Sequence, residues 1–316
     1  MKNKIRKILI IFLLVFVLTG CTKVLQDPKT KKSVYYETNS VKITLNKNIL
    51  CQPEDKGLIE AYNKYKKQVD ISKLPKCENF KISDSAYEGL WDNIFVKPLA
   101  WLIVNLNKFL GNYGITIIVL GLLLRLILAP FTQKTAAQSE NMQKVQPELD
   151  RINKKYEGKN DQESLNNKSM ETMQLYKKYN INPFSSCLFA FIQFPLLIAF
   201  YEAINRVPVI FEGKLLGLVL GTTPLKAIMG GKIIYIVIPL LIIATTIIQQ
   251  KLQKTASTPQ KGDINPNMMM NVMVIMIAVM SFQFSVALSL YWIASTIFTI
   301  GQNLLVKKLK KNKEAK

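Results

Sequence analysis

The sequence predicts an all-α polytopic membrane protein with five transmembrane helices, a cytoplasmic helical hairpin and an amphipathic helix in the outer membrane interface. Hydrophobic residues make up 49% of the 316 residues, and they gather in runs long enough to cross a bilayer. The stretches between these runs are polar, and lysines are concentrated in the inner loops and the tail, as the positive-inside rule expects. One apolar run, Ile115–Phe131, carries Arg125 a little past its middle.

The composition limits the functions that the chain could have. It holds 42 Lys and Arg against 21 Asp and Glu, a net charge of +21, and no histidine. The lack of histidine removes His-based catalytic triads and His-containing metal sites. The four cysteines lack metal-ligand spacing, and no nucleotide-binding or hydrolase motif is present. We therefore expect no catalytic residue, no metal and no cofactor, and thus a protein that is not an enzyme.

Residues 1–20 are typical of a signal peptide, with a basic start followed by the apolar core Ile8–Leu18. The residues that follow this core, Leu18-Thr19-Gly20-Cys21, resemble the lipobox of bacterial lipoproteins, in which the cysteine is diacylated and becomes the new N-terminus. The alternative is an uncleaved anchor with an incidental cysteine. In both cases the next residues begin outside the cytoplasm.

Residues 21–87 predict a small extracytoplasmic segment that is polar, rich in lysine and without a strong apolar period. Short helices are expected in it, for example over Gly57–Val69. Cys51 and Cys77 both lie on the oxidising side, so they could form a disulfide worth roughly 3 kcal/mol in the chain-entropy model. Two free thiols are an equally good interpretation of the sequence.

Residues 88–110 predict an amphipathic helix in the outer interface. Large apolar residues recur at helical spacing, with the tryptophans at the depth of the headgroups. An extra transmembrane helix is the alternative, but the interspersed polar residues and Pro98 disfavour it.

Five apolar runs are predicted to cross the membrane. They occupy residues 112–131, 183–203, 232–250, 268–282 and 284–306. A tight turn near Ser281–Ser285 joins the last two runs, and the fourth is rich in methionine, which suits adaptable apolar contacts or ordinary lipid-facing packing. The basic tail 307–316 then falls in the cytoplasm. The basic balance is compatible with anionic lipid headgroups or nucleic acid as neighbours, or with the usual lysine excess of inner loops.

The polar stretch 132–182 predicts a cytoplasmic hairpin of two helices. Its arms are about Gln133–Tyr156 and Gln162–Tyr179, and the polar residues 157–161, with one glycine, mark the turn. Apolar residues keep helical spacing more regularly on the first arm than on the second. Charges of both signs suit either a device that docks a partner or a spacer without one.

Arg125 is the residue on which the functional interpretation depends. Its guanidinium stays protonated, and placing it near the bilayer centre costs roughly 2.5–3.5 kcal/mol on insertion scales. We expect it to face a bundle interior or a wet cavity, the alternatives being a side chain that snorkels to the surface or pairs with a buried carboxylate. No Asp or Glu is expected deep inside another span. Polar and aromatic residues of the other spans could line a hydrophilic groove with it, although such residues more often serve helix packing. They are Gln193, Gln283, Ser289, Tyr291, Trp292, Ser295 and Thr296.

Four blocks of the sequence carry a family resemblance. They are 125–130 (RLILAP), 142–149 (MQKVQPEL), 175–195 (LYKKYNINP running on through Cys187 to FIQFP) and 290–295 (LYWIAS). In this order, the blocks resemble the YidC, Oxa and Alb family of membrane-protein insertases over roughly residues 90–306. The lipobox and the short outer segment are similar to the Gram-positive form. One departure is Phe284–Leu288, where the family often has a Pro-Ala/Ser-Gly turn.

The resemblance implies a mechanism for the groove. Such proteins hold it open to the cytoplasm and to lipid but closed on the outside, and they consume no nucleotide. Arg125 would attract the acidic, outward-bound end of a nascent single-span protein, whose apolar segment then slides into lipid. Gln193 and Trp292, with Tyr291 and Ser295, would line the groove.

The resemblance also implies partners and a location. The partners would be nascent membrane proteins, the Sec translocon and the lipid bilayer, with the ribosome and the signal-recognition machinery as further ones. The location would be the bacterial plasma membrane, with a lipid-anchored N-terminus outside and the C-terminus in the cytoplasm. Rival functions are an anion channel or transporter, a lipoprotein enzyme or lipid scramblase, and a structural partner of the Sec translocon that would tolerate loss of Arg125.

Overall fold

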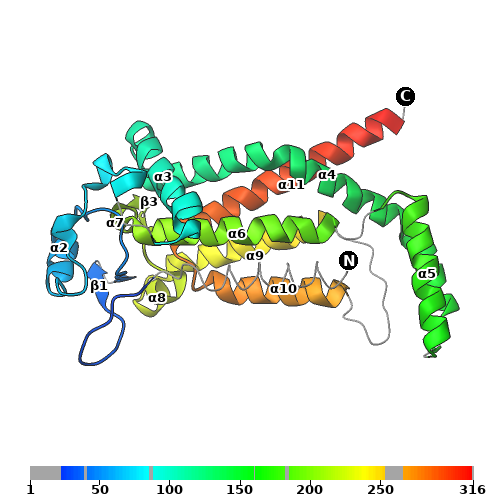
Figure 1. Ribbon diagram of the computed structural model, residues 1–316, viewed down its shortest axis with the longest axis horizontal. Helices are drawn as coiled ribbons and strands as arrows, with labels where there is room; N and C mark the ends of the chain where they lie inside the picture. Colours follow the sequence, from blue (N-terminus) through cyan, green and yellow to red (C-terminus); the bar gives the residue numbers. More distant parts are fainter. Residues whose placement is uncertain are drawn as a thin grey trace. The chain divides into compact units, whose positions relative to one another are not determined.

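The computed structural model describes residues 23–38, 41–84, 88–159, 161–181, 185–252 and 266–314. The predicted signal peptide and the predicted lipidation site Cys21 lie outside these residues. The chain divides into two compact units, which we describe separately (Figure 1). The first takes the described residues up to Gly121 together with Phe194–Pro239 and Phe282–Trp292, and the second takes Leu122–Gln193, Leu240–Ser281 and the chain from Ile293 onward.

The first unit begins with residues 23–84, which we call the outer segment. It contains the antiparallel strands β1 (Tyr35–Thr38) and β2 (Val41–Thr44) and helix α2 (Lys56–Asn63). Three single-turn elements follow, η1 (Ile71–Lys73), η2 (Cys77–Asn79) and η3 (Ile82–Asp84). Seven of the buried apolar side chains form one core: Leu25, Leu45, Ile49, Leu58, Tyr62, Val69 and Ile71.

Two predictions for this region are therefore wrong. A purely helical fold does not hold, because β1 and β2 form a hairpin, and the helix expected over Gly57–Val69 ends at Asn63. The segment also has a core that no apolar period revealed, since its members are spread over loop stretches, α2 and η1. The open question of the cysteines is answered as well, because Cys51 and Cys77 are joined in a disulfide.

Asp55 is expected to make the outer segment sensitive to acid. Its carboxylate caps α2 by accepting the Leu58 N–H at 2.9 Å, and it accepts the Tyr36 hydroxyl at 2.7 Å. The bond from Tyr36, followed by that from Leu58, lowers the pKa of Asp55. The resulting stability is present above the unfolded pKa of about 3.9 and is lost as the pH falls through the lower folded pKa.

The measurement is the thermal midpoint between about pH 2 and pH 6. Wild type should lose stability in the acid part of this range. Asp55→Asn should lose less, because asparagine also caps helices but does not titrate there. Parallel curves for the two proteins would show that Asp55 is not the group responsible.

The predicted interfacial helix is largely helical in the structure. A π-helical turn, η4 (Asp92–Val96), leads into α3 (Lys97–Leu110), which has Pro98 in its first turn, where a proline does no harm. The helix ends at Gly111, whose left-handed backbone (φ 66°) lets its N–H bond the Asn107 carbonyl. Its position in a membrane interface stays a prediction.

Helix α4 (Tyr113–Lys155) runs through 43 residues without a break. We predicted a span over residues 112–131 and a separate helical arm over Gln133–Tyr156, and the expected break between the two is wrong. Pro130 and Pro147 lie inside the helix, where each removes one backbone hydrogen bond. The long helix tolerates this loss, so the predicted span and the first arm of the hairpin are one element.

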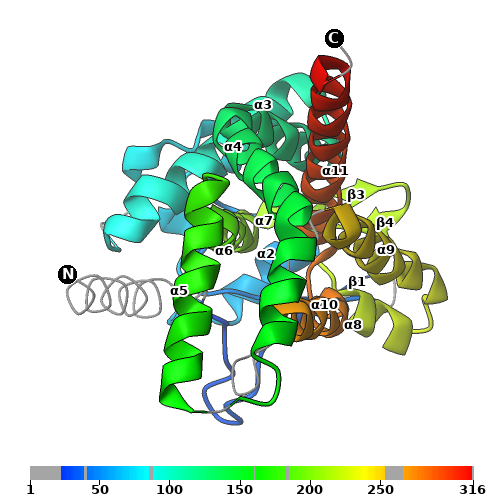
Figure 2. The same ribbon diagram turned by 90° about the vertical axis from the view of Figure 1, so that its right-hand side faces the viewer.

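The hairpin is formed by the C-terminal part of α4 and helix α5 (Gln162–Lys178), which lie side by side in Figure 2. Asp161 caps α5 by accepting the Ser164 N–H at 2.8 Å. Glu171 accepts bonds from Lys155 (2.5 Å) and Tyr156 (2.8 Å) across the pair. The apolar contact between the two arms consists of Val145, Leu149, Leu175 and Ile181.

Leu149→Ala should open this hairpin. Leu149 is fully buried between the arms, so its truncation should cost about 2–4 kcal/mol of local stability. Limited proteolysis of the arms should then accelerate in the variant. Met173→Ala is the matched control, since the Met173 side chain is half exposed, and it should be cleaved as wild type is. Equal cleavage of the two variants would contradict the packing assigned to Leu149.

The rest of the chain is mostly helical. Helix α6 (Ser185–Arg206) precedes α7 (Pro208–Glu212), the small hairpin of β3 (Lys214–Leu215) and β4 (Leu218–Val219), and α8 (Pro224–Met229). Then come η5 (Ile233–Ile236), α9 (Val237–Leu252), α10 (Pro266–Ser281) and α11 (Val286–Glu314). Arg206, three residues beyond the predicted second span, is the last residue of α6, and the predicted basic tail continues α11 to Glu314.

Two helical stretches among the described residues are long and apolar enough to cross a membrane. They are Tyr113–Pro130 and Ile233–Leu252, and Asn271–Ser281 is a shorter apolar helix. Helix α11 is not among them, and several of its side chains are polar and buried: Ser289, Ser295, Thr296 and Thr299. The number of five spans therefore stays a prediction.

Candidate functional site

Arg125 is buried in the second unit, with 5% of its surface exposed. It lies on α4, and its Nε donates a hydrogen bond to the Oγ of Ser295 on α11, a residue that is also buried. This bond orients the guanidinium. The sequence had grouped these two residues, and the structure brings them into contact.

A second contact between α4 and α11 repeats this pattern seven residues further along both helices. The Thr132 hydroxyl donates to Gln302 Oε1 at 3.0 Å, and Gln302 Nε2 donates to the Ala129 carbonyl at 3.0 Å. Because seven residues are close to two helical turns, Arg125 and Thr132 share one face, as do Ser295 and Gln302. The two contacts form a polar seam that holds α4 beside α11 at Arg125.

Tyr291 and Trp292 are described in the first unit, where both pack against aromatic rings. Tyr291 is fully buried and stacks on Phe200 with ring centroids 4.1 Å apart, and Trp292 lies 6.1 Å from Phe284. Gly121 faces the Tyr291 ring, and a Cβ there would come within 3.0 Å of it. A side chain at this position would therefore require the Tyr291 ring to shift.

The five predicted groove residues are thus placed in different ways. Arg125 and Ser295 are in contact, Tyr291 and Trp292 have separate aromatic neighbours, and the Gln193 side chain lies outside what the structure describes. A groove shared by all five remains a prediction. Within the described residues, no group of three or more His, Cys, Asp or Glu side chains could hold a metal ion.

A cluster of buried charges in the first unit was not predicted from the sequence. Arg206, which is 1% exposed, contacts Glu88 at 3.1 Å, Asp92 at 2.8 Å and Glu202 at 3.2 Å. Burial raises the pKa of Asp92, while the positive charge of Arg206 acts in the opposite direction. The cluster fixes the start of the predicted interfacial helix to the C-terminal end of α6.

One local signal for this cluster existed in the sequence. Glu202 and Arg206 are four residues apart, the spacing at which opposite charges meet on a helix. The predicted second span ended at residue 203, so the sequence did not place Glu202 and Arg206 on the same helix. Glu202 is also a buried carboxylate, and it lies one residue before the end of the predicted second span rather than deep inside it.

Comparison with solved structures defines the class of fold. A crystal structure titled "Active YidC insertase crystal structure with the first transmembrane domain resolved" matches with a TM-score of 0.51 at 21% identity. The match covers 78% of this chain but only 52% of that one, so this chain spans about half the length of the solved protein. The fold is therefore that of a YidC-type helical membrane protein.

Comparison of sequences defines the family. The family model described as "60Kd inner membrane protein" matches residues 105–314. The chain is 38% identical over 230 residues to the membrane protein insertase YidC of Oceanobacillus iheyensis, covering 70% of this chain and 85% of that protein. It is also 38% identical over 229 residues to MisCA of Bacillus subtilis, covering 71% and 82%. The chain belongs to the YidC family of membrane protein insertases, which are bacterial inner-membrane proteins.

Proposed function

We propose that this chain inserts nascent membrane proteins into the bilayer through a hydrophilic groove that contains Arg125, without consuming a nucleotide. Membership of an insertase family supports the activity. The observation that carries the role of Arg125 is the burial of a permanent cation that a neutral hydroxyl orients. Such a cation would attract the acidic end of a client, because electrostatic attraction strengthens where water is partly excluded.

The proposed topology has five spans, with the N-terminus outside and the C-terminus in the cytoplasm. Cys21 would carry the lipid anchor, and α3 would lie in the outer interface. The apolar part of the client would leave the groove sideways into lipid, where its backbone is satisfied within its own helix. The hairpin of α4 and α5 would make the first contact with the client or with the signal-recognition machinery. The Sec translocon and the ribosome are further proposed partners, the ribosome through lysines that could touch RNA phosphates.

Insertion by the purified protein in liposomes tests this function. The client is a small single-span protein with an acidic translocated tail, and insertion is measured as protection of that tail from added protease. We expect protection well above that in empty liposomes. Protection equal to that in empty liposomes would exclude autonomous insertion and favour a protein that works only as a partner of the translocon. If small anions cross the liposome membrane while the tail stays unprotected, the result would favour an anion channel instead of an insertase.

A further inference from the structure

The outer segment supplies the end of α6 with hydrogen-bond partners. The Leu50 N–H donates to the Arg206 carbonyl at 2.8 Å, and the side-chain amide of Asn46 donates to the Asn205 carbonyl at 2.7 Å. The last carbonyls of a helix have no partner inside it and must find one elsewhere. Here the partners come from about 155 residues earlier in the chain, and Asn46 and Leu50 are both buried.

The same segment also contacts the connection between α6 and α9. The Glu54 N–H donates to Glu212 Oε1 at 3.0 Å, and Lys226 Nζ donates to the Thr44 hydroxyl at 2.5 Å. The Thr222 hydroxyl donates to the Lys42 carbonyl at 3.1 Å. These contacts lie within the first unit, so the outer segment grips this part of the chain from Asn205 to Lys226.

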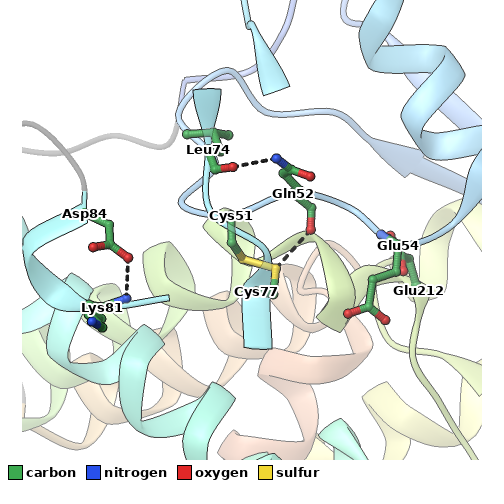
Figure 3. Close-up of a disulfide and its surroundings, with 8 residues drawn as sticks. All are labelled: Cys51, Gln52, Glu54, Leu74, Cys77, Lys81, Asp84 and Glu212. Atoms are coloured by element: carbon green, nitrogen blue, oxygen red, sulfur yellow. Dashed lines mark hydrogen bonds between the residues drawn. A yellow bond between two sulfur atoms is a disulfide. The ribbon is translucent and has the colours of Figure 1, made fainter. Parts of the chain in front are cut away.

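The disulfide lies next to the residues of the outer segment that bond to the end of α6. Cys51 follows the capping residue Leu50 directly, and both Cys51 and Cys77 are buried. Next to the bond, the Gln52 side chain donates to the Leu74 carbonyl at 2.6 Å, which holds the two sides of the 26-residue loop together (Figure 3). A closed loop restricts the conformations that the Leu50 peptide could take if the segment opened.

We propose that the outer segment is a disulfide-closed clamp that positions the C-terminal end of α6, and with it the Arg206 cluster, for insertion. Asn46 and Leu50 are the positioning residues, and the Cys51–Cys77 bond keeps them in place. This role rests on the proposed function, since it assigns a part of the insertion machinery. Insertion should therefore depend on residues that neither contact the client nor lie near Arg125 in the sequence.

Closing the clamp requires an oxidation. The two cysteine thiols lose two protons and two electrons, and the Cys51–Cys77 bond forms while a disulfide of the oxidant is cleaved to two thiols. The oxidant is thus a thiol–disulfide exchange partner on the outer side of the membrane, where such bonds persist. The chain must therefore be oxidised by this partner before it can act as an insertase.

The test combines insertion with amide hydrogen exchange at residues 200–206. The variants are the double substitution Cys51→Ser, Cys77→Ser and the single substitution Asn46→Asp, which keeps the shape of the side chain but removes the donor to Asn205. Each should speed exchange at the end of α6 by roughly fivefold, the factor for loss of one ordinary hydrogen bond. Each should lower insertion several-fold, and exchange in the hairpin should stay as in wild type.

The matched controls are Asn48→Asp and Cys187→Ser. Asn48 lies on the same segment, and its Oδ1 accepts the Lys23 N–H at 3.1 Å, a role that aspartate keeps. Both controls should insert as wild type does. Reduction of wild type under mildly unfolding conditions should reproduce the double variant, and reoxidation should restore insertion.

Three results would overturn the clamp. In the first, wild type inserts the client, and the double variant shows the same hydrogen exchange and the same insertion as wild type. This result would leave the proposed function intact. The second is faster exchange throughout the protein rather than at residues 200–206, which shows general destabilisation. In the third, Asn46→Asp shows the same exchange and insertion as wild type. Because this variant keeps the disulfide, it tests the clamp even if the double variant does not fold. Failure of wild type to insert would instead break the proposed function, and the exchange measurement would still test the grip on α6.

Discussion

Arg125→Ala is expected to abolish insertion of a client with an acidic translocated tail, and Arg125→Lys to retain part of it. A pair of unit charges about 4 Å apart is worth about 4 kcal/mol at an effective dielectric constant near 20, so losing the cation should lower insertion at least tenfold. Lysine keeps the charge but is a point donor that cannot reproduce the planar guanidinium geometry at Ser295. Tail protection in proteoliposomes measures the series.

Two further variants separate charge from structure. Ser295→Ala keeps the cation but removes its orienting acceptor, so it should fall between wild type and Arg125→Ala. Lys108→Ala removes an exposed cation from α3, outside the hairpin and the predicted groove residues, and should insert as wild type does. A client with a neutral tail should depend less on Arg125. Equal insertion by wild type and Arg125→Ala would mean that Arg125 is structural for this client, although the protein would still be an insertase.

Arg206→Ala is expected to give the largest loss of stability. The substitution leaves the carboxylates of Glu88, Asp92 and Glu202 without their shared cation, and two of these, Asp92 and Glu202, are buried. Breaking a buried ion pair by removing one partner typically costs about 3–5 kcal/mol. The midpoint of thermal unfolding in detergent, followed by intrinsic fluorescence, should drop accordingly.

A second substitution distinguishes electrostatics from lost packing. Glu202→Gln in the Arg206→Ala background removes one of the uncompensated charges and should recover part of the lost stability. Arg206→Lys should lie between wild type and alanine, because one ammonium group cannot reach three carboxylates in the way a guanidinium does. Arg151→Ala, which removes an exposed arginine from α4, is the control for stability. A change of less than about 0.5 kcal/mol in Arg206→Ala, the range of ordinary surface substitutions, would contradict the role of the cluster.

The sequence predicted the features that depend on local pattern. Apolar runs located α4, α6 and α9, the polar cluster at residues 157–161 located the turn of the hairpin, and the burial expected of Arg125 is confirmed by its 5% exposure. The contact with Ser295 needed the family resemblance as well, because nothing local joins two residues 170 positions apart.

Other features could not be predicted because their causes are distant in the chain. The Arg206 cluster could not be predicted, because Glu88 and Asp92 come more than 110 residues earlier in the chain. The core of the outer segment was hidden because loop stretches, α2 and η1 each contribute too few residues to give a period. Pro130 appeared to end a helix, yet a long helix with partners along its length can lose one backbone bond and continue.

The unbroken course of α4 has a mechanical consequence. From Arg125 to Lys155 the helix is one stiff rod about 45 Å long at about 1.5 Å per residue. It has two weak points, Pro130 and Pro147, because the Leu126 and Gln143 carbonyls lack the amides that would normally bond them. A load on the tip of the hairpin would be transmitted along this helix and would bend it at these prolines, of which Pro130 lies about one and a half turns beyond Arg125. The tip of the hairpin and the buried Arg125 are therefore mechanically coupled through one helix, which can bend at a proline between them.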